Sequence, residues 1–147
     1  SIHSKPICLA DDLISSGFQT IIFGRSRRTV EFLLTRLKDR SSLAAGAIQA
    51  YRSGYLAEQR RELEAGLRSG RIRGITATTA LELGVDIGGL DASLLAGYPG
   101  SIAATWQQSG RSGRGDAPSL AVLTLSANPL DQYIALHPEF LFSSTPE

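Results

Sequence analysis

The sequence predicts an α/β protein with an open, mostly parallel sheet of about five to six strands and helices on both faces. Short apolar segments rich in β-branched residues alternate with amphipathic helical segments along the whole chain. The strand segments are continuous apolar runs, which is typical of strands covered on both faces. The 147 residues are enough for one domain with a real core and short for two.

The first half of the chain supplies three strands and three helices. The segment 7–17 is a polar-faced helix with a stop at Gly17. A leucine-rich 3.6-residue period predicts a helix over Arg27–Arg40, with Val30, Leu33, Leu34 and Leu37 buried. A second such helix over 56–70 places Leu56, Leu63 and Leu67 on one face and ends at Gly70. The three strands are 18–24 (FQTIIFG), 46–51 (GAIQAY) and 72–77 (IRGITA).

The second half continues the alternation. After a short helical stretch at 79–86, the expected elements are a strand at 91–98, a helix at 101–110, a strand at 119–126 and a helix at 128–137. Residues 138–147 (PEFLFSSTPE) are expected to trail off without a partner in this domain, with Phe140 and Phe142 docking on another domain.

Composition excludes several classes of protein. Hydrophobic residues make up 42% and charged residues 20%, as in ordinary globular domains. No apolar run approaches the roughly 18 residues that span a bilayer, so no membrane is expected. The single cysteine, Cys8, excludes an internal disulfide, and His3 and His137 lie near opposite ends, so no metal site is expected. Without an initial Met or a signal pattern, the chain is expected to be a piece of a longer cytosolic protein.

Arginine is strongly preferred over lysine in this chain. Arginines account for 13 of the 15 cationic residues, although the net charge is only +1. The planar guanidinium meets phosphate oxygens two at a time, which favours an anionic partner. Genomic GC bias is an equally good explanation of the total, but it does not explain where the arginines cluster.

Ligands of open parallel sheets bind beyond the carboxyl ends of the strands, so the loops there carry the candidate sites. Gly24, Arg25 and Ser26 follow the first strand and lead into a helix N-terminus, where backbone N–H groups favour an anion. We interpret them as contacts to nucleic-acid phosphate; the alternative is a solvated basic turn. Arg52 follows the second strand beside Tyr51 and could pair with phosphate, or it could belong to an ordinary turn.

The loop after the third strand, TATTALELGVDIGGL, is long and rich in hydroxyls and glycines. Thr78 and Thr79 are suited both to capping a short helix and to contacting a phosphate. Gly84 breaks the helical stretch, and Asp86 then stands on a glycine-rich loop where its carboxylate could accept from a ribose hydroxyl. The alternative for Asp86 is a simple turn-forming residue.

The segment QQSGRSGRGD places polar and cationic groups on one helix face. Gln107, Gly110, Arg111 and Arg114 recur at spacings of three or four, and Gly113 leaves room for a ligand to approach Arg114. We interpret the two arginines as a pair of guanidinium groups directed at phosphate, against the alternative of a solvated helix end.

Three strings in this order resemble motifs IV, V and VI of superfamily-2 helicases: TIIFGRSRRTVEFL, TATTALELGVDI and QQSGRSGRGD. They belong to the second RecA-like lobe of such motors, and the resemblance runs from about Thr20 to Leu136. Further strings, including YRSGYLAEQRRELEAGLRSG and NPLDQYIALHPEFLF, resemble the MrfA/YprA-like branch of DEAD/DEAH-box DNA helicases. The resemblance implies an ATP-dependent enzyme that moves 3′-to-5′ on single-stranded or forked DNA and acts in DNA repair.

The resemblance implies a role for each site residue. Arg111 and Arg114 match the arginine fingers that meet the ATP γ-phosphate, and Gln107 matches the residue that links this phosphate to the DNA site. Gly84 and Asp86 match the end of motif V, near the nucleotide. The expected nucleic-acid contacts are Gly24, Arg25, Ser26, Arg52, Thr78 and Thr79.

Two departures from DEAD-box RNA helicases favour a DNA motor. Thr79 stands where those proteins have aspartate, and Gln107-Gln108 stands where they have His-Arg. The sequence also lacks a GxxxxGK[ST] loop and a DExH box. ATP and Mg²⁺ are therefore expected to be held mainly by a first RecA-like lobe outside this sequence, and this chain alone is expected to be inactive.

The resemblance also implies a division of the chain. Residues 1–19 are expected to form an entry helix from the first lobe, residues 20–136 the RecA-like domain, and residues 137–147 a tail toward a C-terminal cysteine-rich domain. The expected location is cytoplasmic, at the nucleoid in a bacterium, or nuclear in a eukaryote. The alternatives are a non-catalytic α/β module that binds nucleic acid or protein and, less well supported, a flavodoxin-like nucleotide binder.

Overall fold

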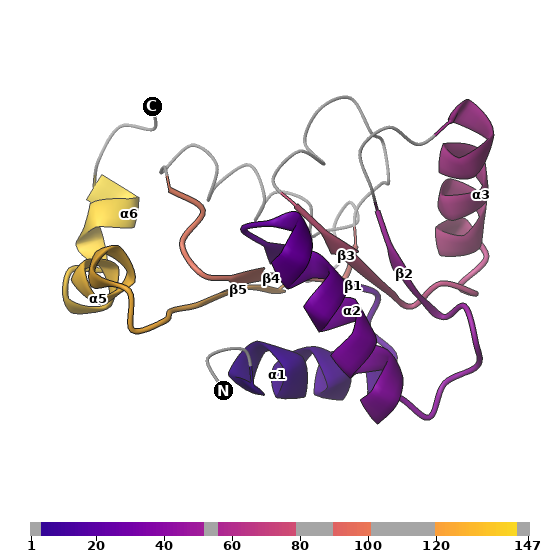
Figure 1. Ribbon diagram of the computed structural model, residues 1–147, viewed down its shortest axis with the longest axis horizontal. Helices are drawn as coiled ribbons and strands as arrows, with labels where there is room; N and C mark the ends of the chain where they lie inside the picture. Colours follow the sequence, from indigo (N-terminus) through magenta and orange to yellow (C-terminus); the bar gives the residue numbers. More distant parts are fainter. Residues whose placement is uncertain (1–3, 52–55, 79–89, 101–119, 144–147) are drawn as a thin grey trace.

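The computed structural model describes residues 4–51, 56–78, 90–100 and 120–143, and these form a parallel five-stranded sheet with helices packed on it (Figure 1). The strand order is β2-β3-β1-β4-β5. The strands are β1 (Thr20–Gly24), β2 (Ile48–Ala50), β3 (Gly74–Ala77), β4 (Ala92–Ala96) and β5 (Leu120–Thr124). The helices are α1 (Ser4–Ser15), α2 (Arg27–Arg40), α3 (Ala57–Arg68), α5 (Pro129–Leu136) and α6 (Glu139–Ser143). The predicted fold class is therefore confirmed.

The central strand β1 sets the register of the sheet. Phe23 lies opposite Ala77 of β3, and Gly24 lies opposite Ala96 of β4. Ala96 in turn lies opposite Thr124 of β5. The carboxyl ends of β3, β1, β4 and β5 therefore meet along one edge of the sheet.

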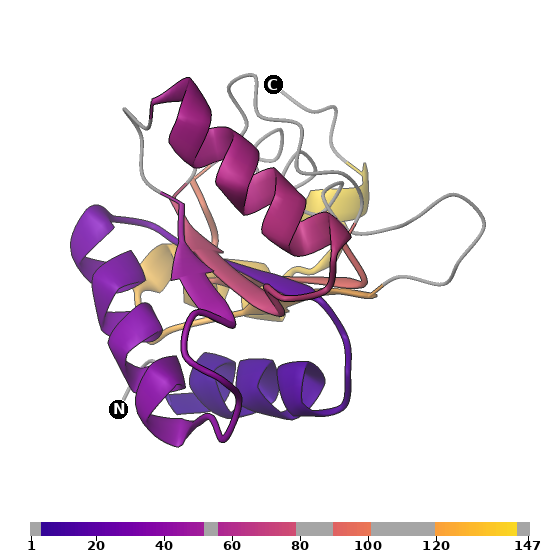
Figure 2. The same ribbon diagram turned by 90° about the vertical axis from the view of Figure 1, so that its right-hand side faces the viewer.

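The two faces of the sheet are covered by different helices (Figure 2). Helices α1 and α2 pack on one face, where the predicted apolar stripe of α2 is buried against Ile22 and Leu94. Helix α3 packs on the other face, where Leu63 and Leu67 meet Ile21 and Ile75. Because alternate residues of each strand point to opposite faces, both faces of these continuous apolar runs are buried.

Leu56 does not share the buried face of Leu63 and Leu67, because it is 70% exposed. Leu56 is the N-cap residue of α3 and has extended backbone, so it precedes the periodic part of the helix. The predicted helix ends are confirmed. Gly17 follows α1 with φ +96° and Gly70 follows α3 with φ +79°, the left-handed conformation that glycine adopts readily.

Helix α1 contributes directly to the core of this domain. Ile7, Ala10 and Ile14 are buried and belong to the same cluster as the strand residues of β1 and β4. A Cβ on Gly74 would lie 2.7 Å from Ile14 Cδ1, so α1 approaches the backbone of β3 closely. The segment predicted as an entry helix is thus packed on the sheet.

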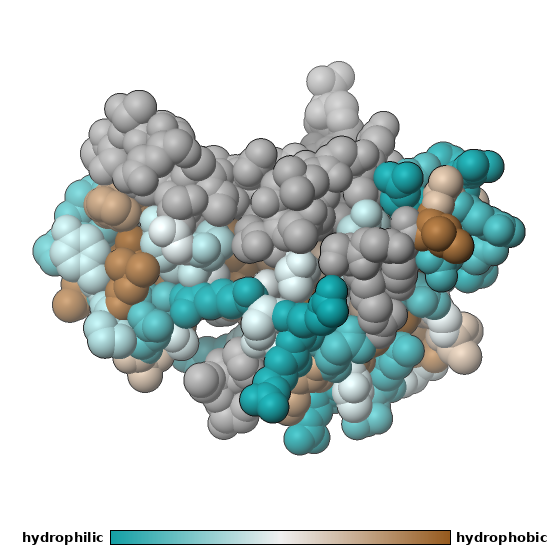
Figure 3. All heavy atoms as spheres, turned by 45° about the horizontal axis from the view of Figure 1, so that its top comes forward, coloured by the Kyte–Doolittle hydropathy of each residue, from teal (hydrophilic) through white to brown (hydrophobic). Residues whose placement is uncertain are grey.

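The C-terminal helices form a third, smaller hydrophobic cluster beyond β5. Leu141 of α6 is buried with Tyr98 and Ile134, so the expectation that residues after 137 trail off without a partner is wrong for this helix. The five-residue α6 was missed because so short an apolar segment has no readable period. Apolar side chains stay exposed on this end, including Leu136 at 77% and Phe142 at 72%, and Figure 3 shows hydrophobic residues gathered at its left, over α5 and α6. No helix within the described ranges is long and apolar enough to cross a membrane.

Candidate nucleic-acid interface at the carboxyl edge

The loops after β1 and β3 lie side by side at the carboxyl edge. Phe23 pairs with Ala77, so Gly24, the last residue of β1, and Thr78, the first residue after β3, follow at adjoining strand ends. Arg25 and Ser26 then lead from β1 into α2. The structure therefore brings together four of the predicted nucleic-acid contacts, Gly24, Arg25, Ser26 and Thr78.

Ser26 forms the N-cap of α2. Its Oγ accepts a hydrogen bond from Thr29 N at 3.1 Å and lies 3.0 Å from Thr29 Oγ1. This arrangement satisfies one of the free N–H groups of the first turn. Ser26 is exposed and Thr29 is half-buried, so the cap borders solvent at the position predicted to meet a phosphate.

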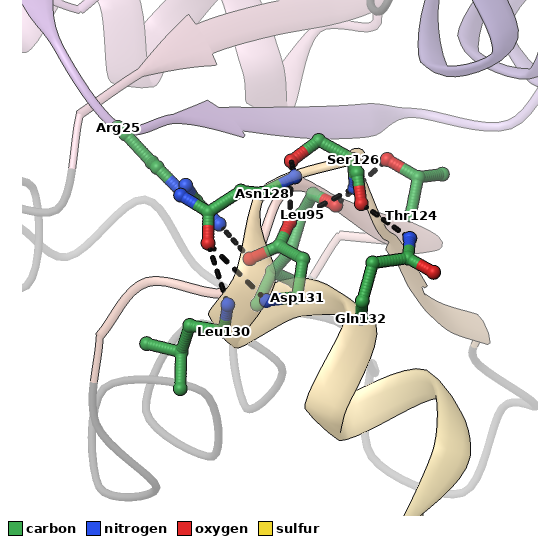
Figure 4. Close-up of polar contacts among 8 residues, drawn as sticks. All are labelled: Arg25, Leu95, Thr124, Ser126, Asn128, Leu130, Asp131 and Gln132. Carbon is green, nitrogen blue, oxygen red and sulfur yellow. Dashed lines mark hydrogen bonds and ion pairs between the residues drawn. The ribbon is translucent and has the colours of Figure 1, made fainter.

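Arg25 is held by a residue from the far end of the chain. Its Nη2 forms an ion pair with Oδ1 of Asp131, which lies in α5 and is completely buried (Figure 4). Oδ2 of Asp131 accepts hydrogen bonds from Ser126 N at 2.9 Å and Ser126 Oγ at 3.0 Å. The Arg25 side chain itself is 36% exposed, so part of it reaches the surface.

A pocket of about 190 Å³ opens beside Arg25 at the ends of β1, β4 and β5. Its lining combines hydroxyls, one guanidinium and backbone, namely Pro6, Arg25, Thr29, Ala96, Gly97, Thr124, Leu125 and Ser126. Gly97 has φ +99°, and a Cβ there would lie 2.8 Å from Arg25 Nε. The guanidinium thus lies across backbone that has no side chain.

The turn that carries Asp131 is ordered by short-range hydrogen bonds. Asn128 Oδ1 accepts from Leu130 N at 2.8 Å and from Asp131 N at 3.4 Å, and Pro129 occupies the first turn of α5 (Figure 4). Gln132 Nε2 donates to Ser126 O at 2.7 Å. The start of α5 is therefore fixed against the end of β5.

Several predicted site residues lie outside the described ranges. They are Arg52, Thr79, Gly84, Asp86, Gln107, Arg111 and Arg114. Their assignments as nucleotide or nucleic-acid contacts stay predictions. Among the described residues, no group of three or more His, Cys, Asp or Glu side chains could hold a metal ion.

The sequence did not predict Asp131 and Gly97 as residues of this site. Asp131 follows an Asn-Pro dipeptide in the first turn of a helix, so it has the sequence pattern of a residue near a helix cap. Its partner Arg25 lies 106 positions away, and nothing in the spacing marks the pair. Gly97 follows a buried strand like several other glycines, and its contact with Arg25 depends on the tertiary fold.

Comparison with known families identifies the family of the chain. The model of the helicase conserved C-terminal domain matches residues 4–116. The chain belongs to this family. The match begins within α1, in agreement with the packing of that helix on the sheet. The predicted family resemblance is therefore confirmed.

The relatives of this helicase C-terminal lobe include the uncharacterized ATP-dependent helicase YprA of Bacillus subtilis, which is 46% identical over 141 residues, or 95% of this chain. A crystal structure of the DUF1998 helicase MrfA bound to DNA and AMPPNP superimposes over the whole chain with a TM-score of 0.93 and 44% identity. The chain spans 19% of the YprA sequence and 21% of the MrfA chain.

A more distant likeness bears on the fold alone. The C-terminal domain of the DEAD-box protein Dbp5 superimposes with a TM-score of 0.72 at 19% identity, covering 93% of this chain and 79% of that domain's chain. The fold is thus the RecA-like fold of DEAD-box C-terminal domains, as the sequence predicted.

Proposed function

We propose that this lobe is the second motor domain of an ATP-dependent DNA helicase that moves 3′-to-5′ on single-stranded DNA and acts in DNA repair. The observation that carries the proposal is the likeness to MrfA over the whole chain, at 44% identity, in a structure whose DNA and AMPPNP are both bound. Family membership supports the coarser statement that the lobe belongs to an ATP-dependent helicase.

The DNA contacts are proposed for the edge described above. Gly24, Arg25, Ser26 and Thr78 would meet phosphates of one strand, together with Arg52 and Thr79. The position of the first four residues at adjoining strand ends supports this role, because ligands of parallel sheets bind there. Backbone N–H groups and hydroxyls bind phosphate without reading sequence, as a translocating motor requires.

The nucleotide contacts are proposed for the second half of the chain. Arg111 and Arg114 would stabilise the negative charge that develops on the γ-phosphate, and Gln107 would connect that phosphate to the DNA site. Gly84 and Asp86 would line the nucleotide-binding site. ATP with Mg²⁺ would supply the hydrolysable phosphoryl group and would be held mainly by a first lobe, because this sequence has neither a phosphate-binding GxxxxGK[ST] loop nor a DExH box.

Replacing one arginine finger in the intact helicase tests the proposal. We expect Arg114→Ala to lower kcat for DNA-stimulated ATP hydrolysis about 10³-fold or more while DNA affinity stays nearly unchanged. Arg40→Ala is the matched control, because Arg40 ends α2 and pairs with Asp11, away from the carboxyl edge. Unchanged turnover in Arg114→Ala would show that Arg114 is not an arginine finger. A wild-type intact protein without ATPase activity would favour the non-catalytic binding module.

Polarity and substrate need a separate measurement. We expect the intact helicase to unwind a duplex with a 3′ single-stranded tail and to leave one with only a 5′ tail intact. Unwinding from the 5′ tail would contradict the proposed direction, and equal activity on RNA tails would contradict the restriction to DNA.

A further inference from the structure

The ion pair between Arg25 and Asp131 has a property that distinguishes it from an ordinary surface pair. Asp131 is 0% exposed, whereas Arg25 is 36% exposed. A buried carboxylate is strongly destabilising unless a counter-charge and hydrogen bonds accompany it. Ser126 supplies hydrogen bonds to Oδ2 at 2.9 and 3.0 Å, and Arg25 supplies the counter-charge at Oδ1.

This asymmetry excludes a competition between Asp131 and an external anion for Arg25. If the guanidinium left Asp131 to follow a phosphate, the carboxylate would remain buried and unpaired. Arg25 must therefore stay on Asp131 when an anion approaches. A guanidinium has five N–H donors, and Asp131 contacts only the Nη2 group. Arg25 also lines the pocket at the strand ends, where an anion can approach it.

The position of the guanidinium is determined on two sides. Asp131 fixes its Nη2 end, and the bare backbone of Gly97 lies under its Nε, Cζ and Nη2 atoms. Asp131 is itself fixed, because the β5–α5 turn holds it through Ser126 and Asn128. A long side chain that would otherwise lose rotamer freedom on binding is thus ordered in advance.

We propose that Asp131 is a positioning residue for Arg25, which holds the guanidinium at the carboxyl edge in the orientation that meets a DNA phosphate. Helix α5 is thereby coupled to the loop after β1, although the two are 106 positions apart in sequence. The inference rests on the proposed function, in which Arg25 is a phosphate contact.

The test compares three variants of the intact helicase by their affinity for single-stranded DNA at several salt concentrations. The double variant Arg25→Ala/Asp131→Asn removes both charges, so it deletes the Arg25 contact without leaving a buried carboxylate unpaired. Asp131→Asn retains the arginine but loses its anchor. Asp11→Asn is the control, because Asp11 belongs to the separate pair with Arg40, at 3.5 Å.

We expect the double variant to bind single-stranded DNA about tenfold more weakly, as for the loss of one charge-assisted hydrogen bond. The slope of log K against log salt should fall by about 0.7, the value for one phosphate contact on a single strand. Asp131→Asn should resemble the double variant in both quantities, with a raised KM for DNA and a nearly retained kcat. Asp11→Asn should bind like the wild type.

The other outcomes distinguish a failure of the Arg25 contact from a failure of the positioning role of Asp131. If the double variant binds weakly but Asp131→Asn binds like the wild type or more tightly, Arg25 contacts DNA without needing its anchor, and the inference is overturned. If the double variant binds like the wild type, Arg25 does not contact DNA and the inference is overturned as well. The Arg114 measurement tests the motor function independently of this result.

A second variant keeps the inference falsifiable if Asp131→Asn does not fold. Arg25→Lys retains the positive charge beside Asp131 but lacks the planar fork that can meet a carboxylate and a phosphate together. We expect Arg25→Lys to melt at nearly the wild-type temperature and to bind DNA more weakly than the wild type. Wild-type affinity in Arg25→Lys would overturn the positioning role.

Discussion

The guanidinium of Arg25 lies directly against the backbone of Gly97, leaving no space for a side chain. A Cβ on Gly97 would come within 2.8 Å of Arg25 Nε and 3.0 Å of its Cζ, and Gly97 also has φ +99°. Glycine is therefore required here for two independent reasons, backbone conformation and the close approach of Arg25.

A matched pair of substitutions separates these two reasons. Gly100 has φ +104°, and no described atom lies within 4 Å of its Cβ position, so with respect to the described residues Gly100→Ala carries only the backbone penalty, about 1–2 kcal/mol. We expect Gly97→Ala to lose a further 1–3 kcal/mol, roughly the cost of overpacking, measured by urea denaturation of the lobe. Equal losses in the two variants would show that Arg25 moves aside freely.

Helix α1 is expected to be part of the folded lobe rather than a connecting segment. Ile14 is 2% exposed and packs on β3 at Gly74, so Ile14→Ala should lower the free energy of unfolding by about 2–5 kcal/mol. Cys8→Ala on the exposed side of the same helix should change it by less than about 0.5 kcal/mol. A small effect of Ile14→Ala would support the division at residue 20 that the sequence suggested.

The parts of the fold that were predictable are those encoded by local patterns. The period of Val30, Leu33, Leu34 and Leu37 identified α2, and the apolar runs identified the five strands, because burial on both faces leaves a continuous signal. Helix α6 has too few residues for a period, and Leu56 was misassigned because periodicity does not distinguish an N-cap residue from the first helical turn.

The candidate site was predictable only in its local parts. Motif order and position after strands identified Gly24, Arg25, Ser26 and Thr78, which the register then brought together. The partner of Arg25 was not predictable, because Asp131 is separated from it by almost the whole domain and its complete burial is a property of the packed helix α5. An ion pair between residues far apart in sequence produces no recurring pattern that a single sequence would show.

Gly66 of α3 is expected to resist a substitution that usually stabilises helices. Replacing an interior helical glycine by alanine normally gains about 1 kcal/mol. A Cβ on Gly66, however, would lie 2.5 Å from Ile72 Cδ1 and 2.8 Å from Arg71 Nη2, and Ile72 is buried. We expect Gly66→Ala to destabilise the lobe by about 1–2 kcal/mol in thermal denaturation, since overpacking outweighs propensity.

A second-site change tests the cause assigned to Gly66. Ile72→Ala removes both atoms that approach most closely, Cδ1 at 2.5 Å and Cγ1 at 2.7 Å, so Gly66→Ala/Ile72→Ala should be more stable than the sum of the two single effects predicts. Strict additivity would show that the two positions do not clash. A stabilising Gly66→Ala would show that α3 can shift away from the sheet without loss.

The isolated chain is expected to show no measurable ATPase activity. The residues proposed to meet the γ-phosphate are present, but the sequence has neither a lysine-bearing phosphate loop nor a DExH box to hold Mg²⁺. Charge stabilisation by arginine has no effect on a phosphoryl group that is not positioned. Phosphate release by the purified 147-residue chain, with single-stranded DNA and with EDTA as the control, measures this directly. Turnover that EDTA abolishes would mean that this lobe alone assembles a complete nucleotide site, and the two-lobe motor would have to be abandoned.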